Sequence, residues 1–281
     1  MKIVKEIKEI RQVLNKERAE GKIIGLVPTM GYFHHGHLEL MKHAREECDI
    51  VVVSLYVNPT QFSPAEDYDS YPRDLGRDEA LAEQEGVDYL FCPPDSEMYL
   101  PNHLTYVEVK GITEKLCGVS RPHHFRGVTT IVAKLFNVVK PDKAYFGQKD
   151  AQQVTVIKKM AEDLSFDLEI VTVPTVREKD GLAMSSRNCY LSDSERKEAL
   201  VLSESLQLAQ SLIDSGELVA ARIKQEMREI IESKSQVHLE YLSVCDNKTL
   251  EELPQIRGEI LIALAAKVGK ARLIDNIVIK V

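Results

Sequence analysis

The chain has 281 residues, of which 44% are hydrophobic and 28% are charged. This balance is typical of a globular protein and excludes a disordered or membrane-spanning chain, while the length favours one large domain plus a smaller one. The formal net charge of −8 would repel a polyanion, so we expect no nucleic-acid partner, and a phosphate ligand would need a local cluster of donors. We find no signal-type apolar run and no stretch of membrane-spanning length, so we expect a cytoplasmic protein with no membrane contact.

The first part of the chain alternates segments typical of buried strands and of helices, after a start (residues 1–22) with charged and apolar residues at helical spacing. Strand patterns lie at 22–29, 49–58, 88–93, 143–147 and 167–176, and helix patterns lie at 36–49, 73–87, 127–141 and 151–164. Helical crossovers between parallel strands cover both faces of a sheet. We therefore predict a Rossmann-like, doubly wound α/β domain over residues 1–176.

The composition changes near residue 177, where the chain becomes polar and loop-like. Ser192 and Glu195 form a capping-box pattern, which predicts a helix that runs to about Asp214. A second helix is expected over 217–234, and strands are expected at 238–246, 259–268 and 271–281. The pattern indicates a small α+β domain over residues 177–281.

The five cysteines are scattered along the chain without a CxxC pair. They are Cys48, Cys92, Cys117, Cys189 and Cys245. This spacing predicts buried free thiols, with neither a disulfide framework nor a cysteine zinc site.

The stretch VPTMGYFHHGH, from Val27 to His37, follows the first predicted buried strand. Ligands of open parallel sheets bind beyond the carboxyl ends of the strands, so its position favours a functional role. Gly31 allows a close turn, and a helix that begins near Gly36 presents its N–H groups and the positive end of its dipole. His34 and His37 would share a helix face and could both donate hydrogen bonds to phosphate oxygens.

Two other interpretations of these histidines stay open. His35 and His37 form an HxH after a strand, an arrangement that many metal-dependent hydrolases use, although no later strand end supplies a further histidine with an aspartate. Alternatively, the histidines are ordinary polar residues of a loop. The chain lacks GxGxxG and GxxxxGK[ST], so the two commonest phosphate-binding turns are absent.

HxGH in a first strand-to-helix turn resembles the nucleotidyltransferase superfamily, in which this motif cradles the triphosphate of ATP. The later segment AMSSRN (183–188) resembles the loop that closes over the same phosphates. Four further segments, PTMGYFHHGH, YVNPTQF (56–62), YPRD (71–74) and 121–153, are together similar to the pantothenate synthetases, the pantoate–β-alanine ligases of coenzyme A biosynthesis. The resemblance is dense up to the AMSSRN loop and rests on length and layout beyond about residue 195.

The resemblance implies a role for each matching residue. The catalytic residues would be His34, His37, Lys149 and Arg187. The ATP site would comprise Met30, Gly31, Tyr32, Phe33, His34, His35, Gly36, His37, Gly147, Gln148, Lys149, Asp150, Val176, Met184, Ser185, Ser186 and Arg187. The pantoate and β-alanine pocket would comprise Gln61, Gln153, Asn58, Tyr71, Arg121 and His124. Asp78 would lie near Mg²⁺.

The implied reaction joins (R)-pantoate to β-alanine through a pantoyl adenylate and releases AMP and pyrophosphate. The resemblance also implies ATP as co-substrate, Mg²⁺, a homodimer, and closure of residues 177–281 over the ATP site. Three alternatives stay open: another HxGH nucleotidyltransferase with a phosphate acceptor, a metal-dependent hydrolase that uses His35 and His37, and a nucleotide-sensing module that binds ATP without turnover.

Overall fold

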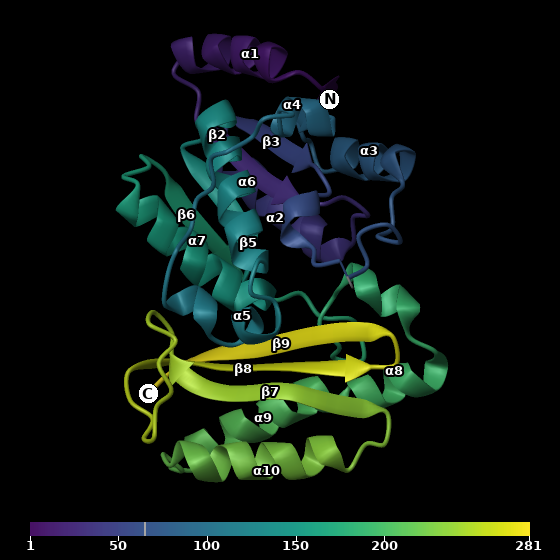
Figure 1. The fold of residues 1–281 in the computed structure, drawn as a ribbon, viewed down its shortest axis with the longest axis vertical. Helices are drawn as coiled ribbons and strands as arrows, with labels where there is room; N and C mark the ends of the chain where they lie inside the picture. Colours follow the sequence, from purple (N-terminus) through teal and green to yellow (C-terminus); the bar gives the residue numbers. More distant parts are fainter. Residues whose placement is uncertain (65) are drawn as a thin grey trace. The chain divides into compact units, whose positions relative to one another are not determined.

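The computed structural model describes residues 1–64 and 66–281 and divides them into two compact units (Figure 1). The first unit comprises Met1–Glu114, Gly118–Gly147 and Val156–Pro174. The second unit comprises Lys115–Cys117, Gln148–Thr155 and Thr175–Val281. The predicted boundary between residues 176 and 177 stays a prediction.

A six-stranded parallel sheet forms the centre of the first unit. Its strands are β1 (Lys2–Val4), β2 (Ile24–Thr29), β3 (Ile50–Leu55), β4 (Tyr89–Phe91), β5 (Lys143–Gly147) and β6 (Glu169–Val173), and their order in the sheet is β1-β4-β3-β2-β5-β6. The chain passes outward from β2 through β3 to β4 and then returns to β5, beside β2. The strand order therefore reverses between β2 and β5, which is where open α/β sheets bind their ligands.

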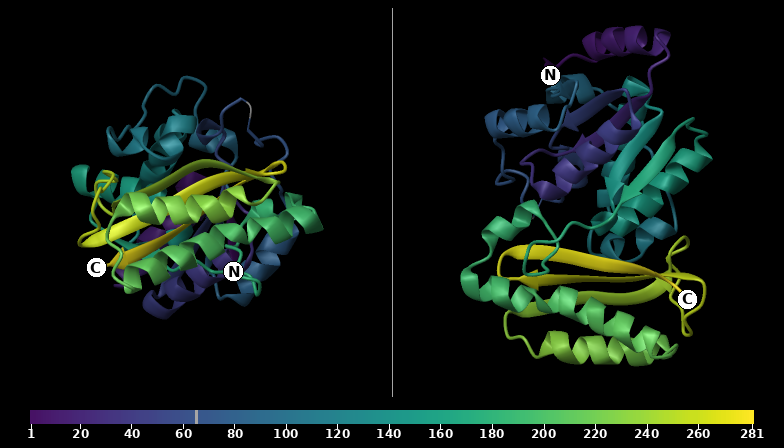
Figure 2. Two further views of the ribbon diagram at one scale, coloured as in Figure 1. Left: turned by 90° about the horizontal axis from the view of Figure 1, so that it is seen from below. Right: turned by 180° about the vertical axis from the view of Figure 1, so that it is seen from behind.

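Helices cover both faces of this sheet (Figures 1 and 2). They are α1 (Ile7–Ala19), α2 (His35–Glu47), α3 (Leu75–Gln84), α4 (Asp95–Met98), α6 (His124–Val139) and α7 (Ala151–Asp163), with short turns α5 (Cys117–Ser120), η1 (Pro59–Gln61) and η2 (Ile112–Glu114). Met41 of α2 shares a buried cluster with Tyr145 of β5, whereas the next residue, Phe146, contacts Phe136 of α6. Since successive strand residues point to opposite faces, α2 and α6 lie on opposite sides. The predicted doubly wound α/β fold is confirmed.

The second unit is an antiparallel sheet packed against helices, as predicted for a small α+β region. The strands β7 (Val237–Asp246), β8 (Glu259–Val268) and β9 (Ala271–Lys280) are joined in that order. The helices α8 (Asp193–Ala199), α9 (Val201–Asp214) and α10 (Ala220–Glu232) pack on the sheet, and η3 (Gln148–Asp150) and η4 (Ser186–Tyr190) complete the unit. Leu206, Ile223 and Ile262 belong to the apolar cluster that joins α9 and α10 to the strands (Figure 1).

Three features differ from the sequence-based expectations. Strand β1 was not predicted, because three residues are too few to show a strand period beside the long helical pattern. The helix expected from Ser192 to Asp214 keeps its capping box but is interrupted at Leu200, whose carbonyl also accepts a hydrogen bond from the Ser203 hydroxyl. All five cysteines are free, but only Cys48, Cys117 and Cys245 are buried as predicted; Cys92 is partly exposed and Cys189 is exposed on η4. In the part of the chain that the structure describes, no helix is both long and apolar enough to span a membrane.

Candidate active site

The turn after β2 folds tightly before α2 begins. Gly31 and Tyr32 both have positive φ angles, of 81° and 51°. A Cβ atom on Gly31 would lie 3.0 Å from the Asp78 carboxylate and 3.0 Å from Leu55, so glycine is required both by conformation and by space. The turn brings His35 to the first position of α2, at the carboxyl end of the sheet.

Asp78, in helix α3, fixes the backbone of this turn. Its carboxylate accepts hydrogen bonds from the backbone N–H groups of Tyr32 (2.6 Å) and Phe33 (2.7 Å), and the residue is only 1% exposed. Burial raises the pKa of Asp78, while the two N–H groups oppose this shift because they stabilise the carboxylate. The Phe33 side chain is fully buried in the core, so only its backbone is available to a ligand.

His34 and His37 cap the start of α2 reciprocally. His34 Nδ1 accepts from the Gly36 N–H (3.1 Å), and His37 Nδ1 accepts from the His34 N–H (3.3 Å). This is the capping-box arrangement with imidazole rings in place of hydroxyl and carboxylate groups. The two rings are in contact, with centroids 4.1 Å apart and planes tilted by 32°.

The capping bonds also decide which nitrogen of each ring carries hydrogen. A ring nitrogen that accepts an N–H must be unprotonated, so a neutral ring carries its hydrogen on Nε2. Both rings therefore present Nε2–H as a donor, at a helix N-terminus that already favours negative charge. The arrangement is suited to binding the oxygens of an anion.

Gln61 lies beside the histidine turn and is oriented by its neighbours. The buried Asn58 donates to Gln61 Oε1 (3.0 Å) and to the Gly127 carbonyl (3.1 Å). This leaves Gln61 Nε2 as the donor end, and it points to the Met30 sulfur at 3.1 Å. A sulfur atom is a weak acceptor, so a carboxylate or hydroxyl oxygen could replace it readily.

Of the remaining predicted residues of the first unit, His124 is the one that the described contacts join to Gln61. His124 Nδ1 lies 2.9 Å from the Gln61 carbonyl. Arg121 instead makes two bonds of 2.7 Å to Glu66, and Tyr71 is buried against Phe62. Burial alone would raise the pKa of Glu66, but the Arg121 guanidinium outweighs it and holds the pKa below the usual value. Gly147 ends β5, at the same edge of the sheet as the turn.

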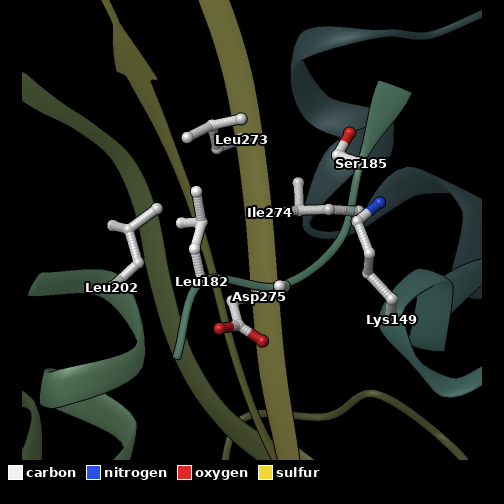
Figure 3. Close-up of a pocket in the computed structure, with 8 residues that line it drawn as sticks. Lys149, Leu182, Ser185, Leu202, Leu273, Ile274 and Asp275 are labelled. Carbon is white, nitrogen blue, oxygen red and sulfur yellow. The ribbon is translucent and has the colours of Figure 1, made fainter. Parts of the chain in front are cut away.

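The second unit contains the other predicted nucleotide residues. Lys149 and Ser185 line one pocket, together with Leu182, Ala183, Leu202, Leu273, Ile274 and Asp275 (Figure 3). The Lys149 ammonium lies 3.9 Å from the half-exposed Asp150 carboxylate. Gln153 lies half-buried on α7.

The AMSSRN loop is an ordered turn. Ser185 caps η4 by accepting the Arg187 N–H at 3.2 Å, and Ser186 and Arg187 are the first two residues of that turn. The Met184 N–H donates to the Val176 carbonyl at 3.0 Å, which ties the loop to the chain segment that enters it. Met184, Ser185, Ser186 and Arg187 are all partly exposed.

Sequence reasoning overlooked two features of these sites. Asp78 was assigned to Mg²⁺ and not to the turn, since its two N–H partners lie 46 and 45 residues away in the chain. Asp275 and Asn276 were not identified at all, although a polar pair inside the apolar strand ARLIDNIVIKV is a signal in itself. The described residues contain no group of three or more His, Cys, Asp or Glu side chains placed to hold a metal ion.

The fold and the turn together define a class: a doubly wound α/β protein whose switch point carries an HxGH turn at a helix N-terminus. Comparison with known proteins gives the family. The family model described as pantoate-beta-alanine ligase matches residues 2–278, so the chain belongs to the pantoate-beta-alanine ligase family.

Relatives and solved structures agree over nearly the whole length. The chain is 55% identical to a pantothenate synthetase of Pelotomaculum thermopropionicum, over 99% of each chain, and 53% identical to that of Acetivibrio thermocellus, over 100% of each. The crystal structure of pantothenate synthetase from Thermus thermophilus has a TM-score of 0.94 at 45% identity, covering 99% of each chain. That of a pantoate-beta-alanine ligase from Francisella tularensis, complexed with beta-gamma ATP and beta-alanine, has a TM-score of 0.81 at 35% identity, covering 99% of this chain and 97% of that one. The predicted resemblance and the predicted enzyme class are confirmed.

Proposed function

We propose that this chain uses ATP to condense (R)-pantoate with β-alanine, forming pantothenate, AMP and pyrophosphate through a pantoyl adenylate. The observation that carries the proposal is the pair His34 and His37, whose capping bonds at the switch point engage Nδ1 of both rings and so put the ring hydrogen of each on Nε2. Family membership and the ATP and β-alanine bound to the Francisella relative support the choice of substrates.

In the first step the pantoate carboxylate attacks the α-phosphorus of ATP. An O–P bond forms, the bond from the α-phosphorus to the bridging oxygen breaks, and pyrophosphate leaves. Negative charge grows on the phosphoryl oxygens and the leaving group, so catalysis requires positioned positive charge and N–H donors. We assign these roles to His34, His37, Lys149 and Arg187, with Ser185, Ser186 and the remaining nucleotide residues of the sequence prediction as further contacts.

Gln61 would receive pantoate. Because Asn58 fixes its amide, Gln61 offers Nε2–H to an oxygen of the hydroxy acid, while Met30 supplies an apolar contact for the geminal methyl groups. Gln153 is proposed as the second amide, and Asn58, Tyr71, Arg121 and His124 as the surrounding residues. The Arg121–Glu66 pair satisfies Arg121 within the protein, so its contribution is proposed to be the shape of the pocket.

In the second step the β-alanine amine attacks the acyl carbon, a C–N bond forms, and the C–O bond to AMP breaks. An acyl adenylate reacts with water, so the intermediate must be shielded until the amine arrives. We propose that residues 177–281 close over bound ATP for this purpose.

Mg²⁺ is expected to accompany ATP. Asp78 fits poorly as a direct ligand, because both of its oxygens already accept backbone N–H groups and the residue is 1% exposed. We therefore propose that the phosphates and water carry most of the Mg²⁺ coordination, as is usual for this ion. A homodimer and a cytoplasmic location stay predictions.

The test is pyrophosphate release from ATP and Mg²⁺ with pantoate, without and then with β-alanine, alongside mass detection of the product. Release that depends on pantoate, becomes catalytic with β-alanine and yields pantothenate is the expected result. If folded protein releases no pyrophosphate with pantoate, the proposal fails, and assays with phosphate acceptors would then test for another nucleotidyl transfer.

A further inference from the structure

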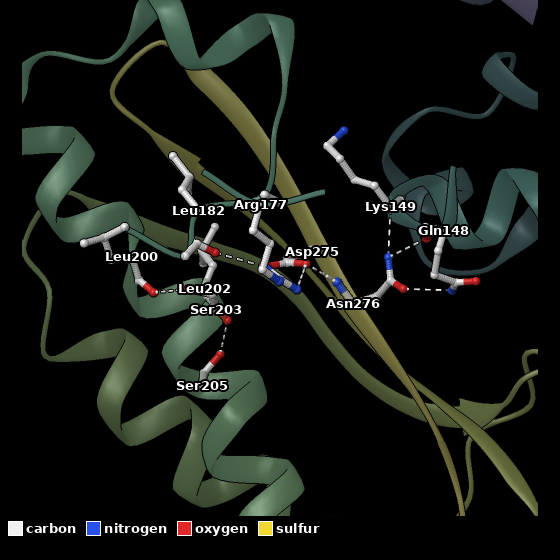
Figure 4. A network of polar contacts seen from close by, with 12 residues as sticks. Gln148, Lys149, Arg177, Leu182, Leu200, Leu202, Ser203, Ser205, Asp275 and Asn276 are labelled. Carbon is white, nitrogen blue, oxygen red and sulfur yellow. Dashed lines mark hydrogen bonds and ion pairs between the residues drawn. The ribbon is translucent and has the colours of Figure 1, made fainter. Parts of the chain in front are cut away.

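Asp275 and Asn276 form a buried polar pair in the middle of β9. They are 3% and 4% exposed and lie in a strand that is otherwise largely apolar. Burying such groups is unfavourable unless every polar atom has a partner. Their partners are therefore informative, and they belong to two separate segments of the second unit (Figure 4).

Asn276 holds the backbone on either side of the Lys149 Cα atom. Its Nδ2 donates to the carbonyls of Gln148 (3.0 Å) and Lys149 (2.8 Å), and its Oδ1 accepts from Gln148 Nε2 (3.0 Å). Both hydrogens of the amide are thus used on consecutive carbonyls of η3. A single side chain fixes the segment from which the Lys149 ammonium extends.

Asp275 holds the segment that leads into the AMSSRN loop. Its two oxygens accept from Arg177 Nη1 (2.6 Å) and Nη2 (3.0 Å), and Arg177 Nη1 also donates to the Gly181 carbonyl (3.2 Å). Arg177 pairs with Ala183 as an isolated antiparallel bridge. The carboxylate therefore fixes a small hairpin that ends two residues before Ser185.

Neighbouring residues of a strand point to opposite sides, so two adjacent side chains can reach two segments from one rigid support. The Asn276 N–H also donates to Asp275 Oδ1 at 2.8 Å, which links the two contacts. We propose that Asp275 and Asn276 are positioning residues that set the placement of Lys149 relative to Ser185–Arg187. This inference rests on the proposed function, in which both segments bind ATP phosphates.

The first test is a double-mutant cycle of Asn276→Ala and Lys149→Ala, read as the ATP Kd by calorimetry and as kcat and KM for pantoate-dependent pyrophosphate release. If Asn276 acts through Lys149, Asn276→Ala should weaken ATP binding roughly 10- to 100-fold in the wild-type background and less than about twofold in the Lys149→Ala background. An equal loss in both backgrounds, or no loss in either, would overturn the inference.

Asn247→Ala is the control, because it removes an asparagine in the same unit whose Nδ2 donates to the Glu259 carboxylate (2.9 Å) and not to the backbone of η3. Its ATP Kd should equal that of the wild type. Should Asn276→Ala fail to fold, Asn276→Thr keeps one donor and serves in the same cycle.

The second cycle pairs Asp275→Asn with Arg187→Ala. The amide keeps the size of the carboxylate but can accept only one of the two Arg177 bonds, so Asp275→Asn should loosen the hairpin and weaken ATP binding. If Asp275 acts through Arg187, this effect of Asp275→Asn should disappear in the Arg187→Ala background. An effect that persists at full size overturns this half of the inference.

Because the Kd requires no turnover, failure of the inference and failure of the proposed function can be distinguished. Coupled cycles without pyrophosphate release would overturn the proposed function alone, whereas normal ligase activity with uncoupled cycles would overturn this inference alone. A wild type that does not bind ATP would overturn both.

Discussion

At the scale of the residue, His34 and His37 each have two tasks on one ring. Nδ1 caps helix α2, and Nε2 carries the ring hydrogen that we propose is donated to phosphate. Replacement by alanine removes both functions, so an inactive alanine variant would not show which of the two matters. The side chain of asparagine places Oδ1 near the position of Nδ1 and has no atom at Nε2, so it separates them.

We expect His37→Asn to keep the acceptor for the His34 N–H and to lose the donor to phosphate. Its free energy of unfolding should stay close to that of the wild type, while pyrophosphate release should fall roughly 10²- to 10³-fold. His37→Ala should lose activity to the same degree and also about 0.5–2 kcal/mol of stability. Urea unfolding and the pyrophosphate assay on both variants test this, and a fully active His37→Asn would contradict the assignment.

Asp78→Asn should loosen the turn that carries the histidines. An amide can accept only one of the N–H groups of Tyr32 and Phe33 and turns a donor towards the other, which we expect to cost about 1–3 kcal/mol of stability and most of the activity.

The pH dependence of that difference has a definite sign. Because burial raises the pKa of Asp78, the pH-dependent part of the stability from this group is fully present below its ordinary pKa of 3.8 and is lost as the pH rises through the raised value. The advantage of the wild type over Asp78→Asn should therefore grow as the pH falls from neutrality towards that value. Unfolding titrations of both proteins at several pH values measure it, and a difference that shrinks on acidification would show that the shift has the opposite sign.

The sequence could predict the histidines but not what holds them. Glycines next to a cluster of histidines after a buried strand lie close together in the sequence, so the motif can be identified from the sequence alone. Asp78 gave no such signal, because a carboxylate in the first turn of a helix is ordinary, and its partners become visible only when the sheet brings α3 under the turn.

At the scale of the element, Gln61 depends on how closely α6 approaches η1. A Cβ atom on Gly127 would lie 2.4 Å from the Thr60 carbonyl oxygen and 2.6 Å from the Gln61 nitrogen. These are backbone atoms, so a larger residue at 127 can be accommodated only if η1 moves. Glycine is therefore needed for contact rather than for its φ angle.

We expect Gly127→Ala to displace Gln61, to lower stability by about 1–3 kcal/mol and to raise KM for pantoate more than KM for ATP. Gly76→Ala is the control, since it lies in helix α3 with open space around it and should stabilise the protein by about 0.5–1 kcal/mol. Substrate titrations of both variants decide the matter; equal changes in the two KM values would argue against a local displacement of Gln61.

Elements were predictable where the apolar period was long. The central strands and α6 follow from their patterns, whereas β1 depends on its pairing with β4, because Lys2–Val4 aligns with Tyr89–Phe91 only after the sheet has formed. A three-residue segment whose strand conformation depends on tertiary pairing cannot be predicted from its own sequence.

At the scale of the whole molecule, the second compact unit includes two short segments from within the sequence span of the first. Lys115–Cys117 and Gln148–Thr155 belong to the second unit, although most of their sequence neighbours belong to the first. Cys117 lies 3.2 Å from the Tyr241 hydroxyl, the Lys115 ammonium donates to the Thr249 carbonyl at 2.9 Å, and Asn276 bonds to Gln148 and Lys149. A pattern read in chain order shows none of this.

An isolated fragment of residues 177–281 should therefore be less stable than the same residues in the full chain. It lacks the partners of the buried Asn276 and of the largely buried Tyr241, and a buried polar group without a partner costs about 1–3 kcal/mol. Amide hydrogen exchange of β8 reports on this core in both proteins, and we expect weaker protection in the fragment. Equal protection would show that the two inserted segments contribute nothing to the stability of the unit.

The Asp78 contact also has a consequence for protein engineering. Residues 27–37 carry the HxGH motif, but their conformation is imposed by a carboxylate 46 residues further along the chain. Grafting these eleven residues onto another parallel sheet would transfer the histidines without the Asp78 hydrogen bonds that fix the conformation of the turn. A successful graft would also need a buried carboxylate in the position of Asp78. The smallest part of this site that can be transferred is therefore the turn together with the helix that carries this carboxylate.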